Sequence, residues 1–282
     1  MVSVIYLNFN RKNDLYRSLK EVFKQDFDDF EVIVIDQNST DGSIEMIEQN
    51  YPNVNLTKLS ENLGVAGGRN YGAKMAKGDY LIFIDDDAEL IDYGAVRRVS
   101  LIFDNNIDVN IIAFNIVGHP EIIEKTKYFS LKKDNKVNYY IGCGHSIRKK
   151  AFNQLGGYSE NLFFWGEEIE LAIKSFSIPK NVILYKGDII LYHRISAVQR
   201  LHWKSGRFYY KVRNRMYILH NLLPLYTIPF YKLYYIIAYL IRAIQLSELD
   251  QYFKALKDYK SLNKTPLSQR LHIKDWLRYI YL

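Results

Sequence analysis

Three consecutive aspartates, Asp85–Asp87, are the residues of this sequence whose type and spacing most directly indicate chemistry. They follow the apolar run Tyr80–Ile84, which is typical of a buried strand. Adjacent carboxylates repel one another, and burying them without a partner costs several kcal/mol. We therefore expect a cation here, and Mg²⁺ or Mn²⁺ bridging phosphate oxygens is the simplest candidate. Taken alone, the same run is more often a solvated acidic turn.

The segments around the aspartates alternate between strand and helix patterns. Short β-branched runs are typical of buried strands, and apolar residues three and four apart are typical of helices. The expected strands cover 2–7, 31–35, 54–59, 80–84, 111–117 and the run that ends at His193, and the expected helices cover 12–25, the segment with Ile44 and Ile47, and the residues from the glycine-rich stretch 62–72 to Lys77. This alternation predicts an α/β fold with a parallel sheet.

Polar residues stand where several of these strands end. Asn8 follows the first strand, Asp36 follows the second, and Asp85–Asp87 follow the fourth. Parallel sheets bind ligands beyond the carboxyl ends of their strands, so we expect these side chains to meet there. A plain cap or turn role for Asp36 is the alternative. The sequence has neither a G-x-G-x-x-G motif nor a Walker A motif, so it supports neither a dinucleotide-binding fold nor a P-loop.

Four ordered stretches carry a family resemblance: VSVIYLNFNR, VIDQNSTDGS, NLGVAGGRNYG and GDYLIFIDDDAEL. Together they resemble the inverting family 2 glycosyltransferases with the GT-A fold, and the likeness covers roughly residues 1–215. The resemblance implies a mostly parallel sheet flanked by helices, and a nucleotide-diphospho-sugar donor. It implies that Asp36 binds the nucleoside base, with Asn8 and Asn38 on the same donor side. It also implies that Arg69 lies near the base or the diphosphate.

The same resemblance implies a metal site at the aspartates, which occupy the family's DXD position. Asp87 is expected to bind Mn²⁺ or Mg²⁺ directly. Asp85 and Asp86 are expected to face the ribose, the donor sugar or a metal-bound water, with Asp85 as a second candidate ligand. His193 lies where a histidine completes the metal site in relatives, and a plain hydrogen-bonded histidine is the alternative. A metal on the diphosphate would offset negative charge as the leaving group departs.

The segment 156–171 resembles the family stretch that usually ends in Glu-Asp-x-Asp, with glutamates Glu168 and Glu170 at both Asp positions. Inversion by direct displacement needs one base to take the acceptor hydroxyl proton. By position that base is Glu168, with Glu167 as the fallback, and Glu170 is expected to cap or orient. A solvated acidic helix start is the alternative. Trp165 is expected to contact the acceptor.

Three basic side chains and the one cysteine complete the expectations for this half. His202, Lys204 and Arg207 are expected to close a loop over the diphosphate. Cys143 is expected to be a buried structural thiol, because inversion needs no covalent intermediate. As the single cysteine, it excludes an internal disulfide and suits a reducing compartment. The chain start has neither a basic n-region nor a long apolar h-region, so no secretory signal is expected.

The charge is concentrated at one end of the chain. Residues 205–282 hold 13 Lys and Arg against 4 Asp and Glu, whereas residues 1–204 hold 25 against 27. We expect a catalytic domain over 1–215 and a basic, aromatic helical arm over 216–282 that meets an anionic surface. A membrane span needs about 20 apolar residues, so interfacial amphipathic helices are expected in the arm. A packing arm or a dimer contact is the alternative, and the oligomeric state stays open.

These patterns and the resemblance predict an inverting, metal-dependent glycosyltransferase, peripheral on the cytoplasmic face of the cell membrane. It would add a hexose or a rhamnose to a growing, lipid-linked cell-surface glycan. A UDP-sugar is the favoured donor, and dTDP-rhamnose and GDP-sugars remain open. The alternatives are a nucleotidyltransferase and a non-catalytic carbohydrate- or nucleic-acid-binding protein. A nucleic-acid binder would need no metal, so it would leave Asp85–Asp87 unexplained.

Overall fold

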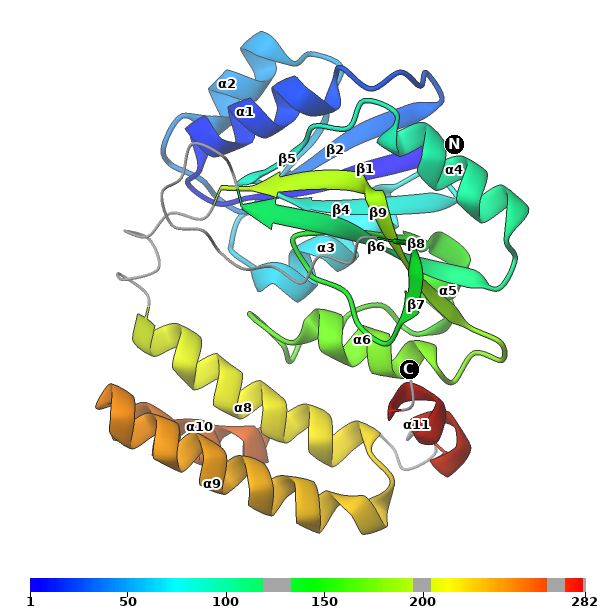
Figure 1. The fold of residues 1–282 in the computed structure, drawn as a ribbon. Helices are drawn as coiled ribbons and strands as arrows, with labels where there is room; N and C mark the ends of the chain where they lie inside the picture. Colours follow the sequence, from blue (N-terminus) through cyan, green and yellow to red (C-terminus); the bar gives the residue numbers. More distant parts are fainter. Residues whose placement is uncertain (119–132, 195–203, 263–271, 281–282) are drawn as a thin grey trace.

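The computed structural model describes residues 1–118, 133–194, 204–262 and 272–280. Within these ranges nine strands form one sheet in the order β3-β2-β1-β4-β8-β6-β9-β5, and β7 pairs with β9 (Figure 1). The strands are β1 (Val2–Asn8), β2 (Phe30–Asp36), β3 (Asn55–Lys58), β4 (Tyr80–Asp85), β5 (Ala88–Leu90), β6 (Val109–Gly118), β7 (Asn135–Val137), β8 (Gly144–Arg148) and β9 (Val182–His193).

The first four strands are parallel, as predicted, and the second half of the sheet is mixed. β1 pairs in parallel with β2 and β4, and β2 with β3. β8 runs antiparallel between β4 and β6, and β5 and β7 run antiparallel to β9. The sequence patterns did not reveal β5, β7 and β8, which are three to five residues long.

Helices cover both faces of the sheet (Figure 1). They are α1 (Lys12–Val22), α2 (Ser43–Asn50), α3 (Gly64–Met75), α4 (Ala95–Asn105), α5 (Lys149–Gln154) and α6 (Glu167–Ser175). In β1, Val4 and Tyr6 belong to the core shared with α1, α2 and α4, whereas Ile5 belongs to the core shared with α3, α5 and α6. Because both faces are covered, the strands are continuously apolar rather than alternating.

The glycine-rich stretch lets α3 approach the sheet closely. A Cβ on Gly72 would lie 2.4 Å from a methyl carbon of Ile5, and a Cβ on Gly68 would lie 3.0 Å from Leu7. Gly64 has a φ of +73°, and a Cβ there would lie 2.2 Å from the carbonyl oxygen of Phe163. These glycines therefore pack the helix against β1 and against the loop before α6.

The C-terminal arm has its own apolar core. The helices of the arm are α8 (Lys204–Leu222), η1 (Leu225–Thr227), α9 (Ile228–Leu246), α10 (Leu249–Asp258), η2 (Tyr259–Ser261) and α11 (Ile273–Ile280). Met216, Tyr239 and Tyr252 pack together there with Leu162 and Ile173 of the preceding region. α8 runs through residue 215, so the division into 1–215 and 216–282, which stays a prediction, would fall inside a helix.

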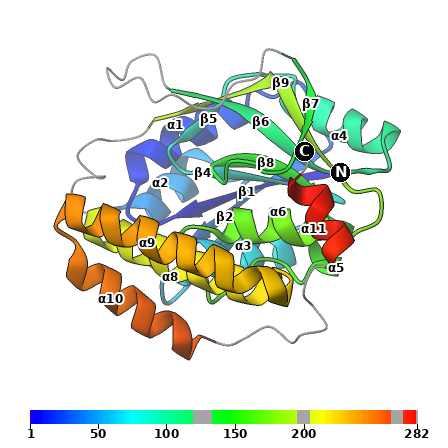
Figure 2. The ribbon, with the colours of Figure 1, turned by 60° about the horizontal axis from the view of Figure 1, so that its bottom comes forward.

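Figures 1 and 2 show α8 between the sheet region and α9, so that α9 forms the outer surface of the arm. The side chain of Asn214 donates to the carbonyl oxygens of Phe164 and Trp165, at 2.8 and 2.6 Å, which ties α8 to the loop before α6. None of the helices in the described ranges combines the length and apolarity that a membrane crossing requires.

Candidate active site

The ends of β1, β2 and β4 lie side by side. Asn8 is paired with Asp36 across β1 and β2, and Leu7 is paired with Asp85 across β1 and β4. The Asn8 amide donates to Asp36 at 2.7 Å, and the other carboxylate oxygen of Asp36 accepts the Ser39 N–H at 2.9 Å. Asp36 is fully buried, so this hydrogen-bonded pair lies below the protein surface at the edge of the sheet.

A cleft of about 620 Å³ opens above this edge. Its wall combines amides, three carboxylates, basic groups and aromatic rings, which suits a polar ligand with an apolar sugar or base face. The lining residues are Leu7, Asn8, Phe9, Arg11, Gln37, Asn62, Gly64, Val65, Asp85, Asp86, Asp87, Phe163, Phe164, His193 and Arg207. The sequence patterns did not single out Gln37 or Arg11, although each stands at or just beyond the end of a strand that carries a predicted residue.

Asp85, Asp87 and His193 form a group that could hold a metal ion. One ligand atom from each lies within 4.8 Å of the others, and His193 Nε2 is 3.0 Å from an Asp87 oxygen. The pairing of Ala88 with His193, across β5 and β9, brings the histidine to the aspartates. Two carboxylates and an imidazole suit Mn²⁺, and carboxylates suit Mg²⁺, so the residues present fit the divalent ion that the sequence implied.

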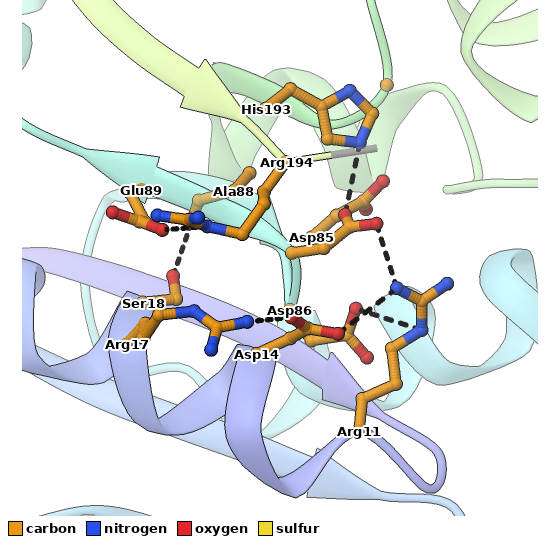
Figure 3. A network of polar contacts seen from close by, with 12 residues as sticks. Arg11, Asp14, Arg17, Ser18, Asp85, Asp86, Ala88, Glu89, His193 and Arg194 are labelled. Carbon is orange, nitrogen blue, oxygen red and sulfur yellow. Dashed lines mark hydrogen bonds and ion pairs between the residues drawn. The ribbon is translucent and has the colours of Figure 1, made fainter. Parts of the chain in front are cut away.

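Arg11 supplies the positive charge expected beside the aspartates. Its guanidinium lies 2.8 Å from Asp87 and 3.6 Å from Asp86 (Figure 3). Burial and the other two aspartates raise the pKa of Asp86 well above its usual value, although Arg11 opposes the shift. Burial would also raise the pKa of Asp87, but hydrogen bonds and charges of His193 and Arg11 lower it. In the sequence, only the position of Arg11 just beyond β1 indicated that it could neutralise the aspartates.

Arg69 lies inside the protein, where it joins two parts of the site. It is 2% exposed, and it donates to Asp85 at 2.7 Å, to Glu167 at 2.9 Å and to the Gly142 carbonyl at 2.7 Å. Arg69 is absent from the wall of the cleft, whereas Asp85 lines it. These contacts make Arg69 a link between a candidate metal ligand and a candidate catalytic glutamate, and its predicted contact with the donor stays a prediction.

The glutamates at the start of α6 have different surroundings. Glu167 is 4% exposed, and burial together with the charge of Glu168 raises its pKa to about 8. Glu168 is half-buried and accepts the Gly166 N–H at 3.2 Å, and burial raises its pKa as well. Glu170 is buried, accepts the Ser159 N–H and pairs with Lys174 at 2.9 Å, so it holds the loop.

The remaining predicted residues lie around the cleft. Asn38 is exposed with a φ of +69°, and Trp165 is half-buried, also with a φ of +69°. Neither residue lines the cleft, and Asp36, Glu167 and Glu168 do not line it either. All five therefore stay predictions as ligand-contacting residues.

The predicted basic loop is only partly visible. Arg207 lines the cleft and lies 5.5 Å above the Phe164 ring, whereas His202 and the side chain of Lys204 fall outside the described residues. Cys143 is buried, as predicted, and burial raises the pKa of its thiol.

Comparison with known families identifies the class of protein. The model of the family described as "Glycosyl transferase family 2" matches residues 3–156, which is more than half of the chain. This chain belongs to glycosyl transferase family 2. The match includes the strand ends and the three aspartates, and it stops before the glutamates of α6.

Curated relatives include proteins with assigned acceptors. A GalNAc(5)-diNAcBac-PP-undecaprenol beta-1,3-glucosyltransferase of Campylobacter jejuni is 30% identical over 66% of this chain and 64% of that protein. The UDP-Glc:alpha-D-GlcNAc-diphosphoundecaprenol beta-1,3-glucosyltransferase WfgD of Escherichia coli is 27% identical over 51% of this chain and 58% of its own length. The matches thus span less than two thirds of either relative.

Solved structures show the same fold. S. aureus TarS 1–349 in complex with UDP-GlcNAc superposes with a TM-score of 0.67, at 19% identity, over 92% of this chain and 80% of that chain. The mannosyltransferase PcManGT from Pyrobaculum calidifontis, in complex with GDP-Man and Mn²⁺, gives a TM-score of 0.63 at 17% identity, over 94% and 76%. The predicted GT-A fold is confirmed.

Proposed function

We propose that this chain is an inverting, divalent-metal-dependent glycosyltransferase that moves one hexose from a nucleotide-diphospho-sugar to a lipid-linked glycan. The observation that carries the proposal is the Asp85, Asp87 and His193 group at the mouth of the cleft, beside the ends of β1 and β2. Mn²⁺ or Mg²⁺ held there would neutralise the diphosphate as it leaves.

On the donor side, the nucleoside would lie over the Asn8 and Asp36 end of the cleft. The buried Asn8–Asp36 hydrogen bond fixes both side chains before the donor arrives, and Gln37 lines the cleft next to them. A UDP-hexose is the favoured donor, supported by the UDP-GlcNAc in the TarS structure and by the glucosyltransferase names of the relatives. dTDP-rhamnose and GDP-sugars are the comparison donors in the test.

For the chemical step, Glu168 takes the proton from the acceptor hydroxyl as that oxygen attacks the sugar carbon. The negative charges of two adjacent glutamates would repel each other, so the two side chains do not readily ionise together. Of the two, the buried Glu167 has a pKa of about 8. Near neutral pH the shared proton therefore rests mainly on Glu167, which leaves Glu168 as the acceptor. Arg69 keeps Glu167 in place through its 2.9 Å contact.

On the acceptor side, both named relatives act on undecaprenol-diphosphate glycans, which supports a lipid-linked acceptor for this chain. One face of α9 carries apolar side chains that are between 50% and 77% exposed. They are Phe230, Leu233, Tyr234, Ile237, Ile241 and Ile244, which we call the α9 stripe. We infer that the α9 stripe lies on the cytoplasmic surface of the membrane, because the surrounding arm is basic and anionic lipids attract such segments.

A donor panel tests the donor half of the proposal. The unfolding temperature is measured with UDP-glucose, UDP-GlcNAc, UDP-galactose, dTDP-rhamnose and GDP-mannose, each with Mn²⁺, Mg²⁺ or EDTA. A ligand at a hundred times its Kd stabilises the native state by about 2.7 kcal/mol. We expect such a rise for one donor class, and only with a metal. Equal stabilisation in EDTA, or none by any donor, contradicts the proposal.

The transfer itself is read from the product. NMR of the transferred sugar should show the opposite anomeric configuration to that of the donor, with release of a nucleoside diphosphate. A retained configuration would refute the inverting assignment. Release of inorganic pyrophosphate with a nucleotide-bearing product would instead identify a nucleotidyltransferase, which the family match disfavours.

A further inference from the structure

Three cationic side chains gather between α8 and α9. Lys211 and Arg215 are one turn apart on α8, and Arg242 lies across from them on α9. Partial burial and the nearby charges of Arg215 and Arg242 lower the pKa of Lys211. We call them the seam cluster.

The seam cluster lacks anionic partners within the described part of the chain. No carboxylate of those residues lies within 4.0 Å of its nitrogens, and Arg242 contacts the neutral Gln245 instead. The Nε atom of Arg215 is buried without a hydrogen-bond acceptor there. Lys211 and Arg242 are exposed and Arg215 is half-buried, so three cations, with one unsatisfied donor among them, are accessible to an external anion.

Aromatic rings form the inner wall of this site. The Arg215 guanidinium lies 5.3 Å from the Trp165 ring and 5.1 Å from the Tyr235 ring, and Lys211 Nζ lies 5.9 Å from the Trp165 ring. Trp165 is two residues before Glu167 at the start of α6. The cluster therefore lies beside the loop that precedes α6 and its glutamates, and it is absent from the wall of the donor cleft.

The α9 stripe lies on the same helix as Arg242, on a neighbouring face of that helix. Arg242 directly follows Ile241 of the stripe, and its own side chain is exposed. Figures 1 and 2 show α9 alongside α8 on the outside of the arm, with the end of α9 beside the start of α8. The seam cluster thus lies beside an aromatic ring suited to a sugar, and α9 also carries an exposed apolar face.

We propose that the seam cluster binds the phosphate groups of a polyisoprenyl-diphosphate-linked acceptor. The acceptor sugar would lie on Trp165, and the lipid would run along the α9 stripe. Arginine forks match phosphate oxygens in pairs, and a lysine adds a point charge. The inference rests on the proposed function and names its acceptor: a short glycan with the diphosphate close to the accepting sugar.

A binding experiment tests the site without turnover. The probe is a short-chain polyprenyl diphosphate, compared with the same polyprenol without phosphate, both in EDTA and measured by calorimetry. The test variant is Lys211→Glu with Arg242→Glu, and the control is Lys257→Glu with Lys260→Glu, two exposed lysines of α10 and η2. Circular dichroism and the unfolding temperature establish that both variants fold.

We expect the diphosphate to bind the parent protein at least tenfold more tightly than the alcohol. The test variant should lose about tenfold or more of that affinity, because two of the three cations that would contact the phosphates are replaced by carboxylates. The control should change less than about twofold. Equal affinity for diphosphate and alcohol, or equal losses in the two variants, overturns the proposal. So does equal binding of phosphatidylglycerol vesicles with and without the polyprenyl diphosphate, because the cluster would then sense membrane charge alone.

Kinetics separate this proposal from the proposed function. The same glycan is offered on a polyprenyl diphosphate and on a neutral alkyl chain. In the test variant, KM for the diphosphate acceptor should rise, while kcat and the KM values for the neutral acceptor and the donor stay unchanged. A rise of KM for both acceptors overturns the inference. A parent protein that binds the diphosphate but transfers to neither acceptor refutes the proposed function and leaves the site standing.

Discussion

Replacing Arg69 by methionine removes the link between the metal group and the glutamates while keeping a similar side-chain length. The change leaves the Gly142 carbonyl and one Glu167 oxygen without their donor in a buried region. Each such loss costs about 1–3 kcal/mol, so the two together cost about 2–5 kcal/mol. Asp85 adds little, because its side chain is 37% exposed and water can replace Arg69 there.

We therefore expect Arg69→Met to lower the free energy of unfolding by about 2–5 kcal/mol, measured by urea titration followed by circular dichroism. The control is Lys74→Met, an exposed lysine of the same helix, which should change stability by less than about 0.5 kcal/mol. Adding Glu167→Gln to Arg69→Met should cause little further loss near neutral pH, because the Glu167 carboxyl group already holds a proton there. A loss below about 1 kcal/mol, no different from the control, would refute the buried link.

Three further outcomes are expected. Glu168→Gln should lower kcat by about a hundredfold or more with unchanged donor binding, whereas Glu167→Gln should keep most activity; the reverse in a steady-state assay shows that the base is Glu167. Asp87→Ala should abolish metal-dependent transfer with an intact circular dichroism spectrum, and appreciable activity in metal-supplemented buffer argues against its metal role. Because the native pKa of Glu167 is about 8 and its usual value is 4.5, the native state binds the extra proton. Stability should thus fall from about pH 5 to pH 8, and Glu167→Gln should flatten this slope in urea titrations; an unchanged slope contradicts the raised pKa.

The sheet core could be predicted from the sequence because its strands are buried on both faces. β1, β2 and β4 are continuous apolar runs, and in parallel strands the polar residues after such runs must meet at one edge. The strand β8 (Gly144–Arg148) was not predicted, because it contains the polar residues His145 and Ser146 and is therefore not a continuous apolar run. Both residues are fully buried. Their partners, the Tyr158 hydroxyl and the Leu81 carbonyl, come from other parts of the chain.

The sequence could not predict the direction in which the charged side chains of the site point. Arg69 stands in a glycine-rich stretch that resembles a ligand-binding loop, yet its partners Asp85 and Glu167 are 16 and 98 residues away. Only the packing of α3 against β1 turns its guanidinium inward. Arg11 likewise has partners 75 and 76 residues away, so its contact with Asp86 and Asp87 depends on the β1–β4 register.

The charges of the cleft explain why metal and donor should bind as a pair. Three aspartates line the cleft together with Arg11, Arg207 and His193, so carboxylates and cations lie side by side where the donor would bind. A diphosphate entering alone would add like charge beside carboxylates, and a divalent ion entering alone would be placed next to the Arg11 guanidinium. When both enter, each offsets the charge that opposes the other. By linkage, the donor must strengthen metal binding by the same factor as the metal strengthens donor binding. The panel with and without metal measures one side of that coupling, and a metal titration with and without the nucleotide measures the other.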